Sequence, residues 1–401
     1  MSTPDPLADV SPPSPEALAH SRRVCERIKA EIEATDEGRL GFDRYMELAL
    51  YAPGLGYYSA GVHKFGAGGD FVTAPEISPL FSRCLARQCA EVLAQIGGGD
   101  VLEVGAGSGV MAAEMLIEMD ALDQLPQRYF ILELSGDLRQ RQQALLTERV
   151  PQLAPRVEWL DRLPDEPLRG VMVGNEVLDA LPVKRVVRSA HGWRELCAGL
   201  QRDELIEVSR EVDASLAAAL QKLPDNLPEG YRTEINTGLA PWLKSLAGVL
   251  GEGVMLWLDY GLPRAEYYHS QRFSGTLRCH YRHRAHDDPW RWPGLQDITA
   301  WVDFTAVAEV LTEAGLPVIG YTTQANFLLG GGLDVLAAEA LQDPGAGESE
   351  AETRERLDMA SQIKRLTLPS EMGEAFKAIG FATDPALRLS GFALRDLTNR
   401  L

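Results

Sequence analysis

The feature that most constrains the fold of this chain is an alternation of short apolar runs with amphipathic helical segments, which begins at Asp100. Strands that alternate with helices in this way build a parallel sheet with helices on its faces. We therefore expect a doubly wound α/β fold with a mostly parallel, seven-stranded sheet. The runs that we assign to this sheet are 100–104, 129–134, 156–160, 170–175, 254–259, 317–322 and 386–392.

The segments before this alternation are expected to be organised differently. Residues 1–14 are rich in Ser, Pro and acidic residues, so we expect a short disordered leader there. Within residues 15–99, helical periodicity over 15–35 predicts a helix. Residues 40–81 contain too many glycines for a helix and too many aromatic residues for disorder. A structured lid that closes over a ligand is the expected result.

The core, residues 100–401, is longer than a seven-stranded sheet requires, so we expect it to carry insertions. The first, at about 183–250, has β-like segments and two helices of its own. The second, at about 262–300, is dense in His, Arg, Trp, Pro and Asp. The third, at about 324–383, reads as helical and contains an acidic tract that is typical of a loop.

The clearest sign of function is the run DVLEVGAGSG, which the helical sequence VMAAEMLIEM follows. A buried strand containing Glu103 leads into Gly105, Gly107 and Gly109, which turn the chain and leave room for a ligand. A dinucleotide-binding loop has its third glycine one position later, where this chain has Val110. The observed spacing suits an adenosyl group without a pyrophosphate, as in S-adenosylmethionine. A strand–helix turn with no ligand is the alternative.

Glu133 supports a cofactor of this kind. It ends the apolar run YFILEL, at the predicted tip of the second strand. A carboxylate there can accept hydrogen bonds from both hydroxyls of a ribose, and such charge-assisted bonds are strong. The alternative is a solvent-exposed acid at the end of a strand.

A second polar group follows the strand in GVMVGNEVLDALPV. We expect Asn175 to bind the cofactor and Glu176 to meet the substrate at the strand tip, with Asp179 close behind. An arginine acceptor stays protonated until methyl transfer, so carboxylates must hold its guanidinium. Glu176 is therefore the first candidate for a catalytic clamp and Asp179 the second. The alternative is that Asn175 and Asp179 only cap a following helix.

The composition argues against several other classes of function. A formal net charge of −19 disfavours a nucleic-acid partner, because phosphate binding needs a cationic face. No apolar run approaches the roughly 18 residues that span a bilayer, so membrane insertion is not expected. The N-terminus lacks the features of a secretion signal, so we expect a cytoplasmic protein. Five scattered cysteines without a CxxC indicate neither a disulfide framework nor a zinc site.

Three histidines at a regular spacing, His280, His283 and His286, suggest a metal site at first sight. Arg282 and Arg284 lie between them and would repel a cation. We therefore expect a polar loop there and no metal ligands.

Taken together, the motifs resemble those of the MidA-like methyltransferases. The resemblance runs from about Leu40 to Phe392, nearly the whole chain. The matching stretches are GYYS (56–59), GDFVTAPEISPLF (69–81), EVGAGSG (103–109), ELSGDLRQRQ (133–142), NEVLDALPV (175–183), LDYG (258–261), SGTLRCHYRH (274–283), DPWRWPGLQDITAWVDF (288–304) and LPSEMGEAFKAIGF (368–381).

This resemblance implies a class I methyltransferase core with S-adenosylmethionine as cofactor. It also implies that Gly69, Asp70 and Thr73 line the site. The mitochondrial members of the family assist complex I assembly and dimethylate an arginine of a complex I subunit. Many of them carry two aromatic residues where this chain has Val177 and Leu178, so the resemblance extends to cofactor binding and leaves the substrate open.

Three functions follow from these observations. The first is methylation of an accessible arginine in a protein substrate, such as a respiratory-complex subunit or an assembly partner. The second is a catalytically silent assembly factor that still binds S-adenosylmethionine, and the third is methylation of a small molecule. The intact glycine loop, Glu133 and Glu176 favour an enzyme. Whether the chain forms a homodimer stays open.

Overall fold

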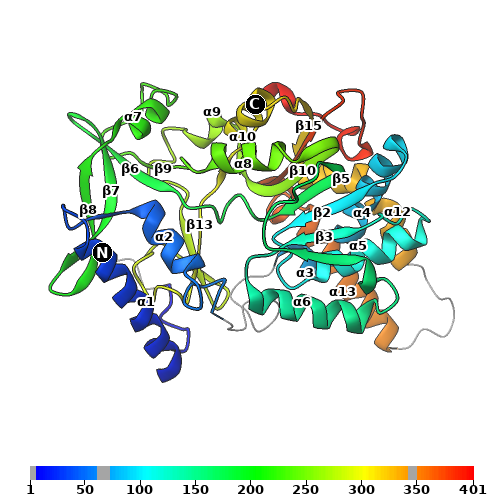
Figure 1. The fold of residues 1–401 in the computed structure, drawn as a ribbon, viewed down its shortest axis with the longest axis horizontal. Helices are drawn as coiled ribbons and strands as arrows, with labels where there is room; N and C mark the ends of the chain where they lie inside the picture. Colours follow the sequence, from blue (N-terminus) through cyan, green and yellow to red (C-terminus); the bar gives the residue numbers. More distant parts are fainter. Residues whose placement is uncertain (1–5, 61–72, 342–349) are drawn as a thin grey trace. The chain divides into compact units, whose positions relative to one another are not determined.

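The computed structural model describes residues 6–60, 73–341 and 350–401, which form two compact units (Figure 1). The first, here named the insertion unit, comprises Met1–Val72, Leu178–Pro241 and Arg264–Val302. The second, here named the sheet unit, comprises Thr73–Val177, Trp242–Pro263 and Asp303–Leu401. The N-terminal region thus folds mainly with the first two insertions of the core, and both units are discontinuous in sequence.

The sheet unit contains the expected doubly wound sheet. Its continuous path has seven strands in the order β15–β16–β10–β5–β2–β3–β4, and the short strand β14 also pairs with β10. Neighbouring strands run parallel, except that β16 is antiparallel to both β10 and β15. The strands are β2 (Asp100–Val104), β3 (Tyr129–Leu132), β4 (Val157–Leu160), β5 (Leu168–Asn175), β10 (Leu250–Leu262), β14 (Val302–Asp303), β15 (Val318–Thr323) and β16 (Phe376–Ala382).

Helices connect the parallel strands by crossovers, which are almost always right-handed. The chain moves along the sheet in one direction through α5 and α6 and in the opposite direction through α8 and α10, so these two pairs cover opposite faces (Figure 1). Helix α4 packs beside α5 and against β5 and β10. The bounds are α4 (Pro79–Ile96), α5 (Val110–Ala121), α6 (Gly136–Arg149), α8 (Leu239–Ala247) and α10 (Phe304–Glu313), and the short helix η1 (Ala154–Arg156) precedes β4.

The strand order reverses between β2 and β5. From β2 the chain proceeds to β3 and β4 on one side, whereas β5 and β10 lie on the other side. Ligands of doubly wound sheets bind outside the carboxyl ends of the strands at such a reversal. The glycine loop follows β2 and Glu176 follows β5, so the topology brings both predicted segments to this point.

Three glycines at the amino-terminal ends of β2, β5 and β10 let these strands approach closely. Gly99, Gly170 and Gly253 have φ values of +157°, +147° and +134°. A Cβ atom on Gly170 would lie 1.8 Å from the carbonyl oxygen of Asp100, and one on Gly253 would lie 1.8 Å from that of Gly170. Only glycine fits at these positions, which fixes the register at the centre of the sheet.

The prediction of a strand at 386–392 is wrong. The last strand is β16, and residues 390–392 form the short helix η2 (Ser390–Phe392). The Phe392 ring lies where Cβ atoms of Gly320 and Gly380 would otherwise be, at 2.2 Å and 2.8 Å from them. Phe392 therefore covers the sheet without joining it, and Leu387 and Leu389 are buried as well, which explains the alternating pattern.

Helices fill most of the third expected insertion. They are α11 (Gln324–Gly330), α12 (Leu333–Ala340), α13 (Glu350–Thr367) and α14 (Met372–Ala375), and η3 (Thr398–Arg400) ends the chain. Of the acidic tract expected to be a loop, residues 342–349 lie outside the described residues. Its remainder, 350–355, begins α13, and this part of the loop prediction is wrong.

The insertion unit contains two further sheets. The larger has the order β1–β7–β6–β9 with β8 also paired to β7, and the smaller has the order β12–β11–β13. Their strands are β1 (Leu40–Gly41), β6 (Lys184–Ser189), β7 (Gly192–Gln201), β8 (Glu204–Glu211), β9 (Arg232–Ile235), β11 (Arg278–Tyr281), β12 (Arg284–His286) and β13 (Asp297–Thr299). The helices of this unit are α1 (Pro15–Glu33), α2 (Phe42–Tyr51), α7 (Ala214–Leu220) and α9 (Arg264–Tyr267).

Two expectations about the N-terminal region need correction. The segment 40–81 is not free of helix, because α2 occupies its first third with buried residues such as Phe42 and Tyr45, and its glycines lie outside α2. Residues 6–14 do not behave as a disordered leader, because Leu7 is buried against Tyr281 and Leu295. Residues 1–5 and 61–72, which include part of the expected lid, lie outside the described residues.

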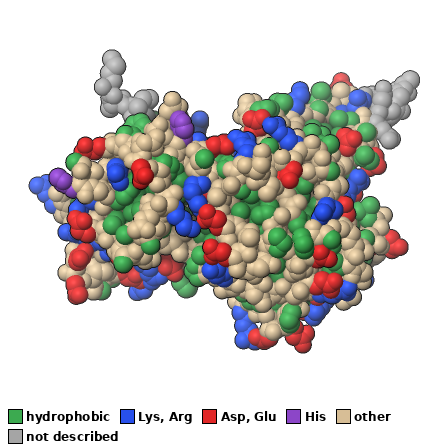
Figure 2. Space-filling model, turned by 90° about the horizontal axis from the view of Figure 1, so that it is seen from above, with side chains coloured by type: hydrophobic (Ala, Val, Ile, Leu, Met, Phe, Trp, Pro, Cys, Tyr) green, Lys and Arg blue, Asp and Glu red, His purple; other side chains and the backbone are tan. Residues whose placement is uncertain are grey.

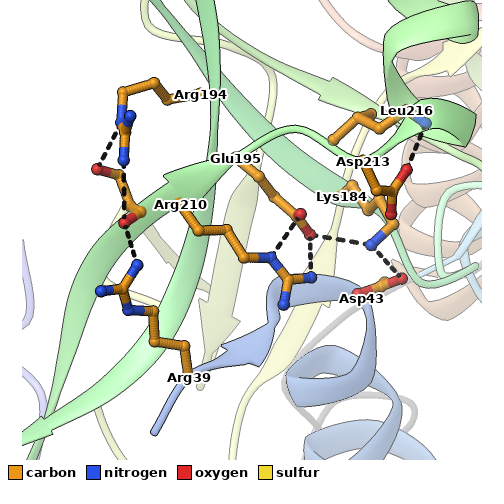
Figure 3. A network of polar contacts seen from close by, with 9 residues as sticks. Arg39, Asp43, Lys184, Arg194, Glu195, Arg210, Asp213 and Leu216 are labelled. Atoms are coloured by element: carbon orange, nitrogen blue, oxygen red, sulfur yellow. Dashed lines mark hydrogen bonds and ion pairs between the residues drawn. The ribbon is translucent and has the colours of Figure 1, made fainter. Parts of the chain in front are cut away.

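A buried ion network joins α2 to the larger sheet of the insertion unit (Figure 3). Glu195 on β7 is fully buried and accepts two hydrogen bonds from Arg210 of β8, at 2.8 Å and 3.1 Å. It also pairs with Lys184 of β6 at 2.9 Å, and Lys184 reaches Asp43 of α2 at 3.2 Å. Because a buried charge without its partners is strongly destabilising, this network fixes α2 on the sheet.

Candidate active site

The glycine loop has the backbone that its sequence predicts. Gly105, Gly107 and Gly109 have φ values of +71°, +55° and +87°, in the left-handed region that favours glycine. A Cβ atom on Gly105 would come within 3.2 Å of Val177, and one on Gly109 within 3.2 Å of Gln142. The loop is therefore enclosed between the end of β5 and α6, while its backbone stays accessible to a ligand.

Glu103, predicted to bind the cofactor, is fully buried in β2. One of its carboxylate oxygens, Oε2, accepts a 2.6 Å hydrogen bond from the hydroxyl of Tyr129 on β3. Burial raises the pKa of the Glu103 carboxyl to about 7, against the effect of the Tyr129 bond. The Glu103 carboxyl, which lies in the strand that leads into the glycine loop, is therefore costly to ionise.

This pKa predicts how stability depends on pH. The folded state binds the Glu103 proton more tightly than the unfolded state, so this residue lowers stability as the pH rises from about 4.5 to about 7. We expect Glu103→Gln, which removes the ionisable group, to raise the free energy of unfolding by about 1–3 kcal/mol at pH 8. The gain should shrink to under about 1 kcal/mol near pH 5. Urea unfolding at both pH values measures it, and equal stabilities at pH 8 would contradict the raised pKa.

Glu133 stands directly after β3 and is connected to the glycine loop. Its Oε1 accepts the backbone N–H of Ser135 at 2.8 Å, and its Oε2 accepts the side-chain amide of Gln142 at 3.1 Å. The same amide nitrogen donates to the carbonyl oxygen of Gly107 at 2.9 Å. Gln142 is fully buried and also accepts a 2.9 Å hydrogen bond from Trp159. Sequence reasoning missed Gln142, although it belongs to the stretch ELSGDLRQRQ.

We expect Glu133→Ala to weaken binding of S-adenosylhomocysteine about 10- to 150-fold. This range corresponds to about 1.5–3 kcal/mol, the usual contribution of hydrogen bonds to a charged group. Isothermal titration calorimetry measures it, with Glu148→Ala as the matched control, since Glu148 is an exposed acid on α6. Wild-type affinity in Glu133→Ala would show that Glu133 is only a strand-end acid.

Glu176 follows β5 in a strained conformation. Its φ is +52°, a value that costs a residue other than glycine about 1–3 kcal/mol and is common at functional sites. Two contacts with the end of β10 hold it. The Glu176 N–H donates to Leu258 at 2.9 Å, and the N–H of Val177 donates to the buried carboxylate of Asp259 at 3.1 Å. Sequence reasoning did not assign this role to Asp259, although LDYG contains it.

The Glu176 carboxylate connects the end of β5 to a short helix at this edge. Its Oε1 accepts the side-chain amide of Asn175 at 3.0 Å and the backbone N–H of Ala74 at 3.2 Å. Ala74 begins the short helix α3 (Ala74–Ile77), and Thr73 is the residue that precedes this helix. Glu76 of α3 accepts a hydrogen bond from Ser108 in the glycine loop. Helix α3 is thus bound both to the loop and to the end of β5.

These contacts bring most of the predicted site residues together at one edge of the sheet unit. They are Thr73, Glu103, Gly105, Gly107, Gly109, Glu133, Asn175 and Glu176. Gly69 and Asp70 lie outside the described residues. Asp179 belongs to the insertion unit, where its carbonyl oxygen accepts the N–H of Ala300 at 2.9 Å. Residues 176–183 contain no helix, so the alternative that Asn175 and Asp179 cap one is wrong.

The residues at this edge fit an adenosyl cofactor. Two buried acceptor atoms, Oε1 of Glu103 and Oδ1 of Asn175, have no hydrogen-bond partner among the described residues. Buried acceptors normally meet donors, and S-adenosylmethionine carries an ammonium, two ribose hydroxyls and an adenine amino group. Leu134, next to Glu133, is 81% exposed and offers an apolar surface for a purine ring.

Two other features of the described residues bear on function. No three His, Cys, Asp or Glu side chains in the part of the chain that the structure covers are close enough to hold a metal ion. His280 lies on β11 and His286 on β12, and burial lowers the pKa of both, in His280 to about 4. Among the helices of residues 6–60, 73–341 and 350–401, none has the length and apolar character needed to cross a membrane.

Comparison with known proteins agrees with this geometry. Residues 84–322 match the family model of S-adenosyl-L-methionine-dependent methyltransferases. A Burkholderia thailandensis protein, whose crystal structure was determined with bound S-adenosyl-homocysteine, has 44% sequence identity to this chain. The two structures match with a TM-score of 0.91, and the match covers 98% of this chain and 100% of that one. A second structure from the same organism is 43% identical over the same shares, with a TM-score of 0.89.

Curated relatives match over most of their length at lower identity. The mitochondrial protein arginine methyltransferase NDUFAF7 of Danio rerio is 27% identical over 385 residues, which cover 89% of this chain and 86% of the relative. Its counterpart from Rattus norvegicus is 27% identical over 399 residues, covering 92% and 86%.

These matches confirm the resemblance to the MidA-like methyltransferases and the doubly wound fold. The family model covers more than half of the chain and includes the glycine loop, Glu133 and Glu176. This chain therefore belongs to the family of S-adenosyl-L-methionine-dependent methyltransferases, and S-adenosylmethionine is its cofactor.

Proposed function

We propose that this chain methylates an arginine side chain of another protein. The observation that carries the proposal is the carboxylate of Glu176, which a strained backbone holds at the end of β5, beside the glycine loop. A carboxylate in this position suits an acceptor that is positively charged. The names of the curated relatives, which are protein arginine methyltransferases, point to the same acceptor.

The residues of the sheet unit would divide the work as follows. The cofactor, when bound, supplies a methyl group activated by its sulfonium. The glycine loop lets the backbone approach the cofactor, and Glu133 accepts hydrogen bonds from its ribose. Asn175 and Ala74 fix the Glu176 carboxylate, which would hold the guanidinium of the substrate and accept the proton that its nitrogen releases on methylation. Positioning of this kind supplies much of the acceleration in a displacement reaction.

We expect local acids such as Glu176 to select the arginine, because the net charge of the protein does not guide a cation to one particular site. The formal net charge is −19, yet Figure 2 shows acidic and basic side chains interspersed on the face that it presents. Charges of mixed sign produce weak fields beyond about 10 Å in physiological salt. The cytoplasmic location expected from the sequence remains a prediction. The curated relatives, by contrast, are named as mitochondrial proteins.

Labelling with tritiated S-adenosylmethionine tests the proposal. The purified protein is added to a lysate of cells that lack it, and the label is separated into acid-precipitable protein and acid-soluble metabolites. We expect label in one or a few protein bands. The soluble fraction is resolved by chromatography, because it also contains the unreacted cofactor, and a lysate without added protein is the control. A new labelled small molecule without labelled protein would favour a small-molecule methyltransferase, and no labelled product beyond the control would favour a silent assembly factor.

A further inference from the structure

A cluster of tyrosines and acids in the insertion unit takes no part in the cofactor site. The hydroxyl of Tyr58 donates a 2.9 Å hydrogen bond to Asp297 at the start of β13. The Tyr58 ring stacks on Tyr51, with 5.4 Å between ring centroids and 23° between the ring planes. Asp297 is 5% exposed, whereas Tyr51 is 38% exposed and brings the cluster to the surface.

Asp179 belongs to the same cluster by its backbone contacts. The hydroxyl of Tyr51 donates to the carbonyl oxygen of Ala180 at 2.9 Å, and the carbonyl oxygen of Asp179 accepts the N–H of Ala300 at 2.9 Å. Residues 179–180 are therefore fixed between Tyr51 and the end of β13. Asp179 is 4% exposed. Burial raises the pKa of Tyr58, and the negative charges of Asp297 and Asp179 raise it further. The charges of both carboxylates are therefore felt at the Tyr58 hydroxyl.

Thr299 provides an independent sign of a ligand. It lies two residues after Asp297 on β13, so both side chains point to the same face of the strand. The Thr299 side chain is 3% exposed, and its hydroxyl has no hydrogen-bond partner among the residues that the structure describes. A buried hydroxyl normally has a partner, so the Thr299 hydroxyl retains the capacity for a hydrogen bond with a ligand.

The ligand chemistry follows from these groups. Two buried carboxylates attract a cation, and the hydroxyl of Thr299 can accept one more N–H. Stacked aromatic rings favour a flat, weakly hydrated cation over a compact ammonium. The guanidinium of arginine has this shape and five N–H donors.

We propose that Asp179, Asp297, Thr299 and the Tyr51–Tyr58 pair form a guanidinium-binding subsite that recognises an arginine of the protein substrate. The inference rests on the proposed function, because it assigns substrate recognition to the insertion unit. The arginine bound here is separate from the methylated one, which the proposed function assigns to Glu176.

Binding of N-acetyl-arginine methylamide to the full-length protein tests the subsite without any methyl transfer. The protein carries ¹³C-labelled tyrosine, and its ring signals are assigned with Tyr51→Phe and Tyr58→Phe variants. We expect the Tyr51 and Tyr58 signals to shift with a dissociation constant in the millimolar range, about −4 kcal/mol. The citrulline analogue, which has the same shape without the charge, should bind at least about tenfold more weakly.

Three variants locate the binding energy. Asp297→Asn should weaken binding of the arginine probe at least about tenfold. Asp287→Asn, which removes an exposed acid from the same unit, should leave it unchanged. If Asp297→Asn fails to fold, Thr299→Val keeps the Tyr58–Asp297 bond and should weaken binding about threefold or more, the effect of a single lost hydrogen bond.

Several results would overturn the subsite. They are no shift of either tyrosine with the arginine probe, equal binding of the citrulline analogue, or unchanged binding in the folded variants at Asp297 and Thr299. Probe binding that depends on Asp297, together with a lysate that yields no methylated arginine, would support the subsite while contradicting the proposed function. With a known substrate, the folded variants should raise KM and leave kcat unchanged, and a lowered kcat with an unchanged KM would contradict a recognition subsite.

Discussion

The variant Glu176→Gln is expected to methylate its protein substrate about 30- to 1,000-fold more slowly than the wild type. This loss corresponds to about 2–4 kcal/mol, the usual effect of removing one charge-assisted contact made mainly in the transition state. The glutamine keeps a carbonyl oxygen that can accept the hydrogen bonds from Ala74 and Asn175, so the local structure should persist. Affinity for S-adenosylhomocysteine should stay unchanged, because we assign cofactor binding to the glycine loop and Glu133.

Initial rates of label incorporation at saturating cofactor measure this effect, and calorimetry measures the affinity. Glu158→Gln is the matched control, since Glu158 is an exposed acid on β4. Full activity in Glu176→Gln would rule out the guanidinium clamp. Equal losses of activity and of cofactor affinity would instead show that Glu176 supports the cofactor site through α3.

The variant Gly107→Val is expected to bind S-adenosylhomocysteine at least about 100-fold more weakly than the wild type. Gly107 has a φ of +55°, which a β-branched residue adopts only at a cost of a few kcal/mol. The Gln142 amide donates hydrogen bonds both to the carbonyl oxygen of Gly107 and to the Glu133 carboxylate. A shift of the loop that relieves the strain would therefore also break its link to Glu133. In the cofactor site that we propose, the added side chain would also occupy space over the loop.

Calorimetry with S-adenosylhomocysteine measures the loss, and the wild type should not bind NAD. Gly136→Ala serves as the control, because a Cβ atom at Gly136 meets no atom within 4 Å and its backbone is not left-handed. Circular dichroism should show that Gly107→Val is folded. Undiminished binding in this folded variant would place the cofactor away from the glycine loop.

Local patterns were enough to predict most strands of the sheet. The strands β2, β4, β5 and β15 fall within two residues of the expected runs, because each is a short run rich in apolar residues. The prediction failed at β16, which lies between β10 and β15. The sequence pattern places residues 376–382 in a helical insertion and the alternating residues before Phe392 in a strand, because alternation indicates only that one face is buried.

The site was predictable as far as its side chains follow strand ends. The glycine loop, Glu133 and Glu176 stand where the sheet topology requires. Gln142 and Asp259 could not be assigned, because their roles depend on contacts between elements distant in the sequence. The cluster of Tyr58, Asp297 and Thr299 could not be predicted for the same reason, since two segments of the insertion unit that are distant in the sequence build it.

The nature of the methylated residue tests the central claim most directly. A protein labelled by this enzyme with tritiated S-adenosylmethionine is hydrolysed in acid, and its amino acids are separated beside methylated standards. We expect the label to migrate with N-methylated arginine and to be greatly reduced in a reaction with Glu176→Gln. Label in methyl-lysine, or label released as volatile methanol from a methyl ester, would contradict it.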